Sequence, residues 1–147
     1  RWPSKAHVVF EAAFGTAGNT ALAAPTGDFD TDLREFVRGA VNFWREPVVE
    51  AAAMGILAER RGDSELHIRT QELLDDKIRA QLAALIRGGA AQGVVRPDVD
   101  TDVLFDALVG TAFYGALVDG RNPDRLADKL CSLVLQGVRP REDREPR

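Results

Sequence analysis

The segment from Asp98 to Val118, DVDTDVLFDALVGTAFYGALV, constrains the fold of this chain more than any other. At about 100° per residue, its apolar side chains follow one another around the whole axis of a helix. They are Val103, Leu104, Phe105, Leu108, Val109, Phe113 and Leu117. A helix of this kind must be buried on all sides. We therefore expect either an unusually central helix or a second copy of the chain that covers part of it, and we favour the second copy.

The segment that follows supports this choice. Asn122 is a good N-cap, Pro123 suits the first helical position, and Asp124 complements the helix dipole in the first turn. The apolar residues of this helix cover an arc of about 200°, which is wider than one core requires. Two such neighbouring helices suggest a four-helix interface between two chains, and the alternative is a buried helical hairpin within a monomer. The residues expected at the dimer interface are Thr111, Tyr114, Leu130 and Val134.

Composition sets the class of protein. The chain has 147 residues, 45% of them hydrophobic, which is enough for one domain with a hydrophobic core. Because its net charge is −4, we do not expect this chain itself to provide the surface that binds nucleic acid. We expect a soluble, cytoplasmic protein, because no apolar run is long enough to span a membrane and no basic-then-apolar leader opens the chain. The single cysteine, Cys131, is interpreted as a core residue in a reducing compartment.

Periodicity and capping signals predict the remaining elements. A helix is expected over residues 5–14, followed by a loop over residues 15–28. Asp30 or Thr31 is expected to cap a second helix that ends near Arg45. A third helix is expected from Pro47 to Arg61, with Met54 beside an inner face formed by Val48, Val49, Ala52, Ile56 and Leu57. One long helix is then expected from Ser64 to Gln92, and the turn over residues 94–98 leads to a central helix that is capped by Asp98 or Asp100.

Catalytic and metal-binding motifs are missing from the sequence. The two histidines, His7 and His67, do not have the Glu-x-x-His spacing of a carboxylate-bridged metal bundle. Gly110 and Gly115 have the glycine spacing of a phosphate loop, but the Lys-Ser/Thr pair that must follow is absent. We interpret these two glycines as places where helices approach closely. We therefore expect no enzymatic activity, no cofactor and no metal site.

The first five residues, Arg1-Trp2-Pro3-Ser4-Lys5, precede an apolar helix. This pattern resembles the junction between the recognition helix and the connecting helix in TetR-family transcriptional regulators, and the order and lengths of the later helices resemble the regulatory domain of that family. The resemblance implies that Arg1 and Trp2 end the recognition helix, that Arg1 contacts DNA and that Lys5 contacts a DNA phosphate. It also implies that residues 1–3 are the end of a truncated helix-turn-helix and that residues 4–138 form a ligand-binding and dimerisation domain. Residues 139–147 contain no apolar residue beyond proline and are expected to be a disordered tail.

The function implied by this resemblance is ligand-controlled DNA binding by a transcriptional repressor. The expected fold is an all-α bundle of about six helices whose last two long helices form a four-helix dimer interface. The expected partners are a second copy of the chain, a small apolar ligand, and operator DNA through the missing N-terminal helices. The alternative function is a free-standing helical protein-interaction module without a ligand.

Aromatic and flexible apolar residues on the middle helices are the candidates for the ligand site. Small-molecule sites are mostly apolar and often lie between the helices of bundles. Each of these residues could equally be ordinary core. The candidates are Phe36, Phe43, Trp44, Met54, Phe105 and Phe113.

Overall fold

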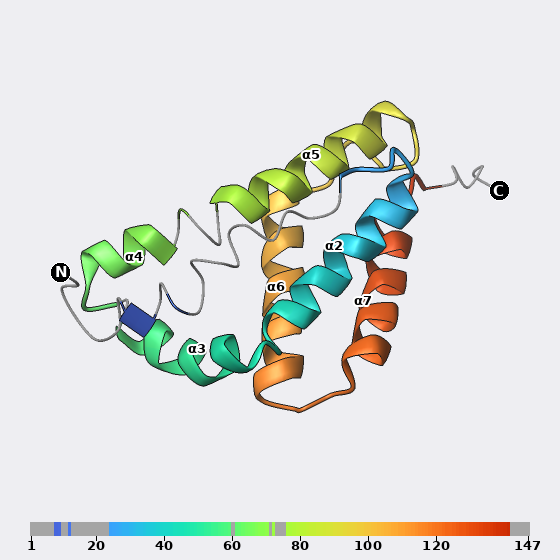
Figure 1. Cartoon of the computed structure of the whole chain (residues 1–147). Coiled ribbons are helices and arrows are strands. Elements are labelled where there is room, and N and C mark those ends of the chain that lie inside the picture. Colours follow the sequence, from blue (N-terminus) through green and yellow to red (C-terminus); the bar gives the residue numbers. More distant parts are fainter. Residues whose placement is uncertain are drawn as a thin grey trace.

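The computed structural model describes residues 8, 9, 12, 24–59, 61–70, 72 and 76–141, and this part of the chain contains helices and no strand. Six helices have defined bounds: α2 (Phe29–Phe43), α3 (Pro47–Glu59), α4 (Ser64–Thr70), α5 (Lys77–Ala91), α6 (Thr101–Leu117) and α7 (Pro123–Val138). Figure 1 shows α2, α5, α6 and α7 grouped together, with α3 and α4 extending from one end of the group. The expected all-α fold is confirmed. The helix expected over residues 5–14 lies mostly outside the described residues, although Val8, Val9 and Ala12 are helical.

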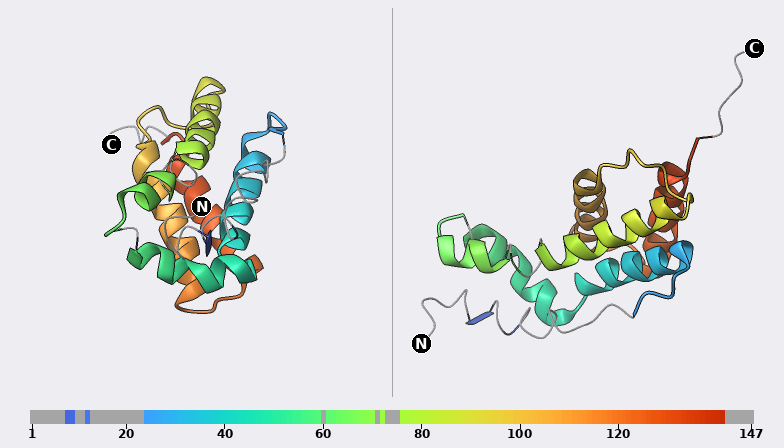
Figure 2. Two further views of the ribbon diagram at one scale, coloured as in Figure 1. Left: turned by 60° about the vertical axis from the view of Figure 1, so that its left-hand side comes forward. Right: turned by 90° about the horizontal axis from the view of Figure 1, so that it is seen from above.

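The core lies between four helices, because α2 packs against α5, α6 and α7. Both views in Figure 2 keep these four helices together. Leu33, Val37 and Val41 of α2 have no exposed surface, and their spacing of four residues places them on one face of the helix. Leu82 of α5 and Leu108 of α6 are equally buried. The amphipathic pattern of α2 therefore directs one continuous stripe into the centre of the bundle.

Helix α6 is buried on only one side within this chain. Its buried residues are Phe105, Leu108, Ala112 and Gly115. The opposite face is bare, with Val103 63% exposed and Tyr114 51% exposed. This largely apolar helix thus keeps an uncovered face, and the single chain does not bury it on all sides as the sequence led us to expect.

Close contact between α6 and α7 depends on one glycine. A Cβ atom at Gly115 would overlap Cδ2 of Leu126, whereas a Cβ atom at Gly110 would have open space around it. Glycine at position 115 therefore allows the two helices to approach each other. The expected role in close approach is confirmed for Gly115, whereas no described helix of the same chain approaches Gly110, which lies on the bare face of α6.

The helix starts follow local hydrogen-bonding rules. Asp100 caps α6 by accepting from the backbone N–H of Val103, and Asn122 caps α7 by accepting from Arg125. Helix α2 begins earlier than expected. Its cap is Asp28, which accepts from the N–H of Thr31, and not Asp30 or Thr31. The buried ring of Phe29 explains the shift, because the first apolar residue of the stripe is drawn into the helix.

The region expected to form one long helix contains two helices, α4 and α5. Glu72 and Asp76, between them, have π-helical backbone geometry, which widens the helix locally. The two helices are anchored separately: Leu66 of α4 is fully buried, while Arg79 of α5 pairs with two carboxylates of α6. The sequence contains no glycine or proline between residues 64 and 87, so it gives no signal for this division.

Helix α3 turns most of the expected face inward. Its buried residues are Val49, Ala52, Ala53 and Ile56, and all but Ala53 were expected on the inner face. Val48 is 54% exposed and Met54 is 62% exposed, so the expectation that they belong to or adjoin the inner face is wrong. The helix is apolar around most of its circumference, and periodicity therefore could not fix the edges of its buried face.

The end of α7 is held by residues from distant segments. The backbone N–H of Arg96 donates to the carbonyl of Val138 at 2.8 Å, and its Nε donates to the carbonyl of Gly137 at 3.1 Å. Arg139 pairs with Asp30 at the start of α2 at 2.7 Å. The two hydrogen bonds from Arg96 satisfy carbonyls at the end of α7 that have no partner within the helix. Arg139 belongs to the segment expected to be a disordered tail, and residues 142–147 of that tail lie outside the described residues.

Among the described helices, none combines the length and apolarity needed to cross a lipid bilayer.

Candidate functional site

A groove of about 350 Å³ lies between α2 and α5. Its wall on α5 is a stripe of residues spaced three or four apart, and its wall on α2 comes from the first two turns of that helix. The lining residues are Ala24, Pro25, Thr26, Gly27, Phe29, Asp32, Glu35, Phe36, Gln81, Ala84, Leu85, Gly88, Gly89 and Gln92. The volume is at the lower end of the range of small-molecule sites.

Small residues on α5 create the space in this groove. A Cβ atom at Gly88 would have nothing within 4 Å, so this position leaves a gap in the wall. The neighbouring Gly89 has another role, since a Cβ atom there would lie 2.5 Å from Cγ2 of Val95 and 2.8 Å from Cδ2 of Phe29. Gly89 therefore lets the Phe29 ring settle against the backbone of α5. The wall of the groove is therefore open at Gly88 and tightly packed at Gly89.

The end of the groove is closed by the turn that precedes α2. Asp32 accepts hydrogen bonds from the N–H and the hydroxyl of Thr26 at 2.8 and 2.7 Å, and from the N–H of Gly27 at 3.2 Å. Gly27 has a φ of +86°, which favours glycine. The amide of Gln92 donates to the carbonyl of Gly27 at 3.3 Å and so joins the turn to the end of α5. The hydrogen bonds from Thr26 hold the pKa of Asp32 below its usual value.

The six residues expected to line a ligand site do not surround one cavity. Phe36 lines the groove between α2 and α5. Phe43, Trp44 and Phe113 form an aromatic cluster instead, with ring centroids 5.1 Å apart in each of two edge-to-face pairs. These rings fill the space that they were expected to enclose.

The other two candidates lie elsewhere. Met54 is exposed on α3, away from the described lining of the groove. Phe105 is buried on α6, with the guanidinium of Arg79 4.3 Å from its ring centroid. Sequence reasoning missed the lining residues of α5, and the small residues Ala84 and Gly88, four apart on one helix face, were the available signal.

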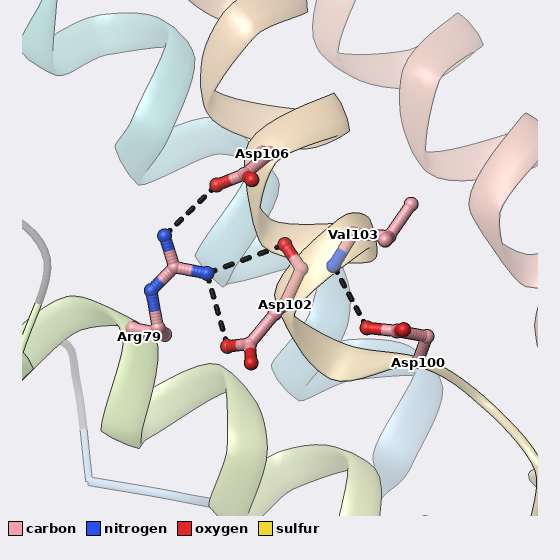
Figure 3. A network of polar contacts seen from close by, with 5 residues as sticks. All are labelled: Arg79, Asp100, Asp102, Val103 and Asp106. Atoms are coloured by element: carbon pink, nitrogen blue, oxygen red, sulfur yellow. Dashed lines mark hydrogen bonds and ion pairs between the residues drawn. The ribbon is translucent and has the colours of Figure 1, made fainter.

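Arg79 joins the start of α5 to α6 (Figure 3). Its Nη1 donates to the carboxylate of Asp102 at 3.0 Å and to the carbonyl of Asp102 at 3.3 Å, and its Nη2 donates to Asp106 at 2.8 Å. Burial works against the charged form of Arg79, but the hydrogen bonds and charges of the two carboxylates outweigh burial and raise the pKa of Arg79. The guanidinium also stacks over the Phe105 ring. Arg79 is thus a charged link between the helix that lines the groove and the helix with the bare face.

A second, more open groove is lined by Val9, Ala12, Pro47, Val48, Ala51 and Ala52, with no polar side chain among these residues. The described part of the chain contains no cluster of three or more His, Cys, Asp or Glu residues that could hold a metal ion.

The residues expected at the dimer interface fall into two groups. Tyr114 is exposed and Thr111 is half-buried, both on α6. Leu130 and Val134 are only 6% and 8% exposed, because they point into the core of their own chain. The exposed apolar residue of α7 is Leu133, at 68%. Arg1 and Lys5, expected to contact DNA, lie outside the described residues.

The family model for the tetracyclin repressor-like C-terminal domain matches residues 23–134. The match begins just before α2 and reaches into the last turns of α7, so it includes the groove, the Arg79 link and the bare face of α6. No curated protein and no solved structure matches the chain significantly. The family match covers well over half of the sequence, and the chain therefore belongs to the tetracyclin repressor-like C-terminal domain family.

Proposed function

We propose that this chain is the ligand-sensing and dimerising part of a TetR-like transcriptional repressor. In this proposal two copies pair through α6 and α7, a small apolar ligand binds in the groove between α2 and α5, and the N-terminal connecting helix transmits the change to a DNA-binding helix-turn-helix. The observation that carries the proposal is the bare apolar face of α6 within a chain that belongs to this family.

The bare face has the composition of an interface between helices. Val103, Tyr114 and Val118 are each more than half exposed on α6. Ala107 and Gly110 lie between them, and the spacing of three or four residues places all five side chains on one stripe. Small residues at the centre of such a stripe allow two helix backbones to come close together. Large exposed apolar patches on soluble proteins commonly mark interaction surfaces.

Helix α7 contributes to the same surface through its edge nearest to α6. Leu126 packs beside Gly115 of α6, and Leu133 lies two turns further along the same side of α7. We therefore propose Tyr114 and Leu133 as central interface residues, with Thr111 at the edge of the stripe. Because a two-fold axis presents the same patch on both copies, one substitution changes the interface twice.

The proposed regulation requires two states of the dimer. A ligand changes DNA binding only if it has different affinities for the DNA-binding and the non-binding state, and its effect cannot exceed that difference. In this proposal Lys5 contributes one phosphate contact when the helix-turn-helix is present, so Lys5→Ala weakens binding about equally on all DNA sequences. A strong dependence of the Lys5→Ala effect on DNA sequence would contradict its assigned role.

Dimerisation is tested with a matched pair of valine substitutions. Val103→Glu places a charge on the bare face of α6, and Val48→Glu places the same charge at an exposed valine near the start of α3. Both substitutions add an acid to the first turn of a helix, so their effects on the helix dipole are similar. We expect light scattering to give twice the mass of one chain for the parent and for Val48→Glu, and a lower average mass for Val103→Glu.

Two results would overturn the proposed dimer. The first is a parent chain that is monomeric at micromolar concentration. The second is an equal mass for the two variants at every concentration, since a buried, unpaired charge at a real interface costs several kcal/mol.

A further inference from the structure

We propose that the groove between α2 and α5 selects a compact apolar cation, such as the ammonium form of an arylalkylamine. This inference rests on the proposed ligand-sensing function and adds the charge of the ligand. The lining carries two carboxylates, Asp32 and Glu35, and no lysine, arginine or histidine among the described residues that form it. The remaining lining is uncharged, with Thr26, Gln81 and Gln92 as its polar side chains. Its largest apolar side chains are Phe29, Phe36 and Leu85.

The positive end of α2 does not reverse this charge preference. A helix N-terminus ordinarily attracts an anion through its free N–H groups. Here the N–H of Thr31, in the first turn of α2, is donated to Asp28, and the N–H groups of Thr26 and Gly27, in the turn before α2, are donated to Asp32. The carboxylates of Asp28 and Asp32 therefore already accept from N–H groups that an anionic ligand could use. A carboxylate ligand would enter a site that already holds negative charge and offers it no cation.

Glu35 is the carboxylate that is free to meet a ligand. Asp32 is committed to three hydrogen bonds with the turn, whereas the ion pair of Glu35 with Arg38 is long, at 3.8 Å. Both side chains of that pair are more than half exposed, so the pair is weak and Arg38 can yield to another cation. An ammonium group beside Glu35 would gain a charge-assisted hydrogen bond.

The apolar part of the groove suits an aromatic or branched aliphatic group. Phe29 and Phe36 are both almost fully buried and line the wall of the groove on α2. Gly88, on the wall formed by α5, leaves space that no side chain fills. Aromatic faces attract cations in addition to providing apolar surface. A volume of about 350 Å³ is sufficient for a ligand of one or two rings. The groove therefore combines apolar contact with negative charge.

The test uses three probes of similar shape: 1-naphthylmethylamine, 1-naphthylmethanol and 1-naphthoate. At pH 7 they are cationic, neutral and anionic. Calorimetric titration of the full chain should give the tightest binding for the amine, by about five- to tenfold over the alcohol, and the weakest for the carboxylate. Glu35→Gln should remove most of the advantage of the amine and leave the alcohol unchanged. Glu50→Gln, on the exposed side of α3, is the matched control and should change neither.

A second pair of variants locates the binding site. A Cβ atom at Gly88 or at Gly55 has nothing within 4 Å, so a leucine fits at either position, but only Gly88 lines the groove. Gly88→Leu should abolish amine binding, and Gly55→Leu should preserve it. Circular dichroism shows whether both variants keep the helical content of the parent.

The possible outcomes separate the inference from the function on which it rests. If the alcohol or the carboxylate binds as tightly as the amine, and Gly88→Leu blocks that binding, the ligand site stands and the preference for a cation is overturned. If Glu35→Gln and Glu50→Gln bind the amine equally, the role of Glu35 is overturned. If no probe binds, or if Gly88→Leu binds as Gly55→Leu does, the groove is not the ligand site, and the proposed sensing function fails with the inference.

Discussion

Two adjacent glycines of α5, Gly88 and Gly89, are predicted to respond oppositely to the same substitution. Glycine within a helix is less favourable than alanine by about 0.5–1 kcal/mol. Gly88→Ala adds a Cβ atom with nothing within 4 Å, so it should stabilise the fold by about 0.5–1 kcal/mol. The lower part of this range is expected, because Gly88 is only three residues from the end of α5.

Gly89→Ala has the same propensity gain and a steric cost. The added Cβ atom would lie 2.5 Å from Cγ2 of Val95 and 2.8 Å from Cδ2 of Phe29, below any normal contact distance. Both neighbours are at most 5% exposed, and the branched Val95 side chain has little rotational freedom with which to move. Overpacking of this kind typically costs about 1–3 kcal/mol. After the propensity gain is subtracted, Gly89→Ala should destabilise the fold by up to about 2.5 kcal/mol.

Urea unfolding followed by circular dichroism measures both effects at one protein concentration. Holding the concentration fixed matters because dimerisation would make stability depend on it. The midpoint should rise for Gly88→Ala and fall for Gly89→Ala, without a change in the slope of the transition. A Gly89→Ala chain at least as stable as the parent would refute the packing of Phe29 and Val95 against α5. A destabilised Gly88→Ala chain would refute the open space at the groove.

Three further predictions concern charged and titratable groups. Arg79→Leu should lower the free energy of unfolding by about 1–2 kcal/mol, measured with urea, and Arg79→Lys should restore only part of it, because a lysine cannot bind two carboxylates with a planar fork. Asp32 has a lowered pKa in the folded state, so its stabilisation is fully present above its usual value of 3.8 and is lost as the pH falls through the folded value. The melting temperature of the parent chain should therefore decrease once the pH is lowered below about 4, and that of Asp32→Asn should decrease less. An equal decrease for both chains would contradict the stabilising role of the Asp32 carboxylate. Burial raises the pKa of the Cys131 thiol, so a thiol reagent should label it slowly in the folded chain and rapidly in urea, and fast labelling of the folded chain would contradict its burial.

The parts of the fold that follow local rules could be predicted from the sequence. Asp100 and Asn122 were identifiable as caps because a capping side chain bonds to an N–H group only a few residues away. The bounds of α7 followed from Pro123 and from the apolar period after it. The division between α4 and α5 was not identifiable, since it depends on where Leu66 and Arg79 find their partners in other helices. Propensity describes a segment by itself and contains no information on such partners.

The candidate site was only partly predictable for a related reason. Aromatic residues were correctly placed on the middle helices, and Phe36 does line the groove. Trp44 and Phe113, however, pack against each other, and a sequence does not show whether two rings fill a space or enclose it. The groove owes its volume to Gly88, a residue that contributes no side chain and that helix propensity marks only as a weak point. Cavities arise from the side chains that are missing as much as from those that are present.

Helix α5 is the element through which the two proposed sites would communicate. One face of α5 lines the groove opposite Phe36, while Arg79, at its start, holds Asp102 and Asp106 of α6 and covers Phe105. The opposite face of α6 carries the proposed dimer contacts. A ligand that separates α5 from α2 would thus act on α6 through a charged link and not through the aliphatic core alone. Because a ligand shifts an equilibrium only by the ratio of its affinities for the two states, a tenfold preference supplies about 1.4 kcal/mol. Loss of the Arg79 link should therefore weaken the effect of the ligand on dimer geometry more than it weakens ligand binding itself.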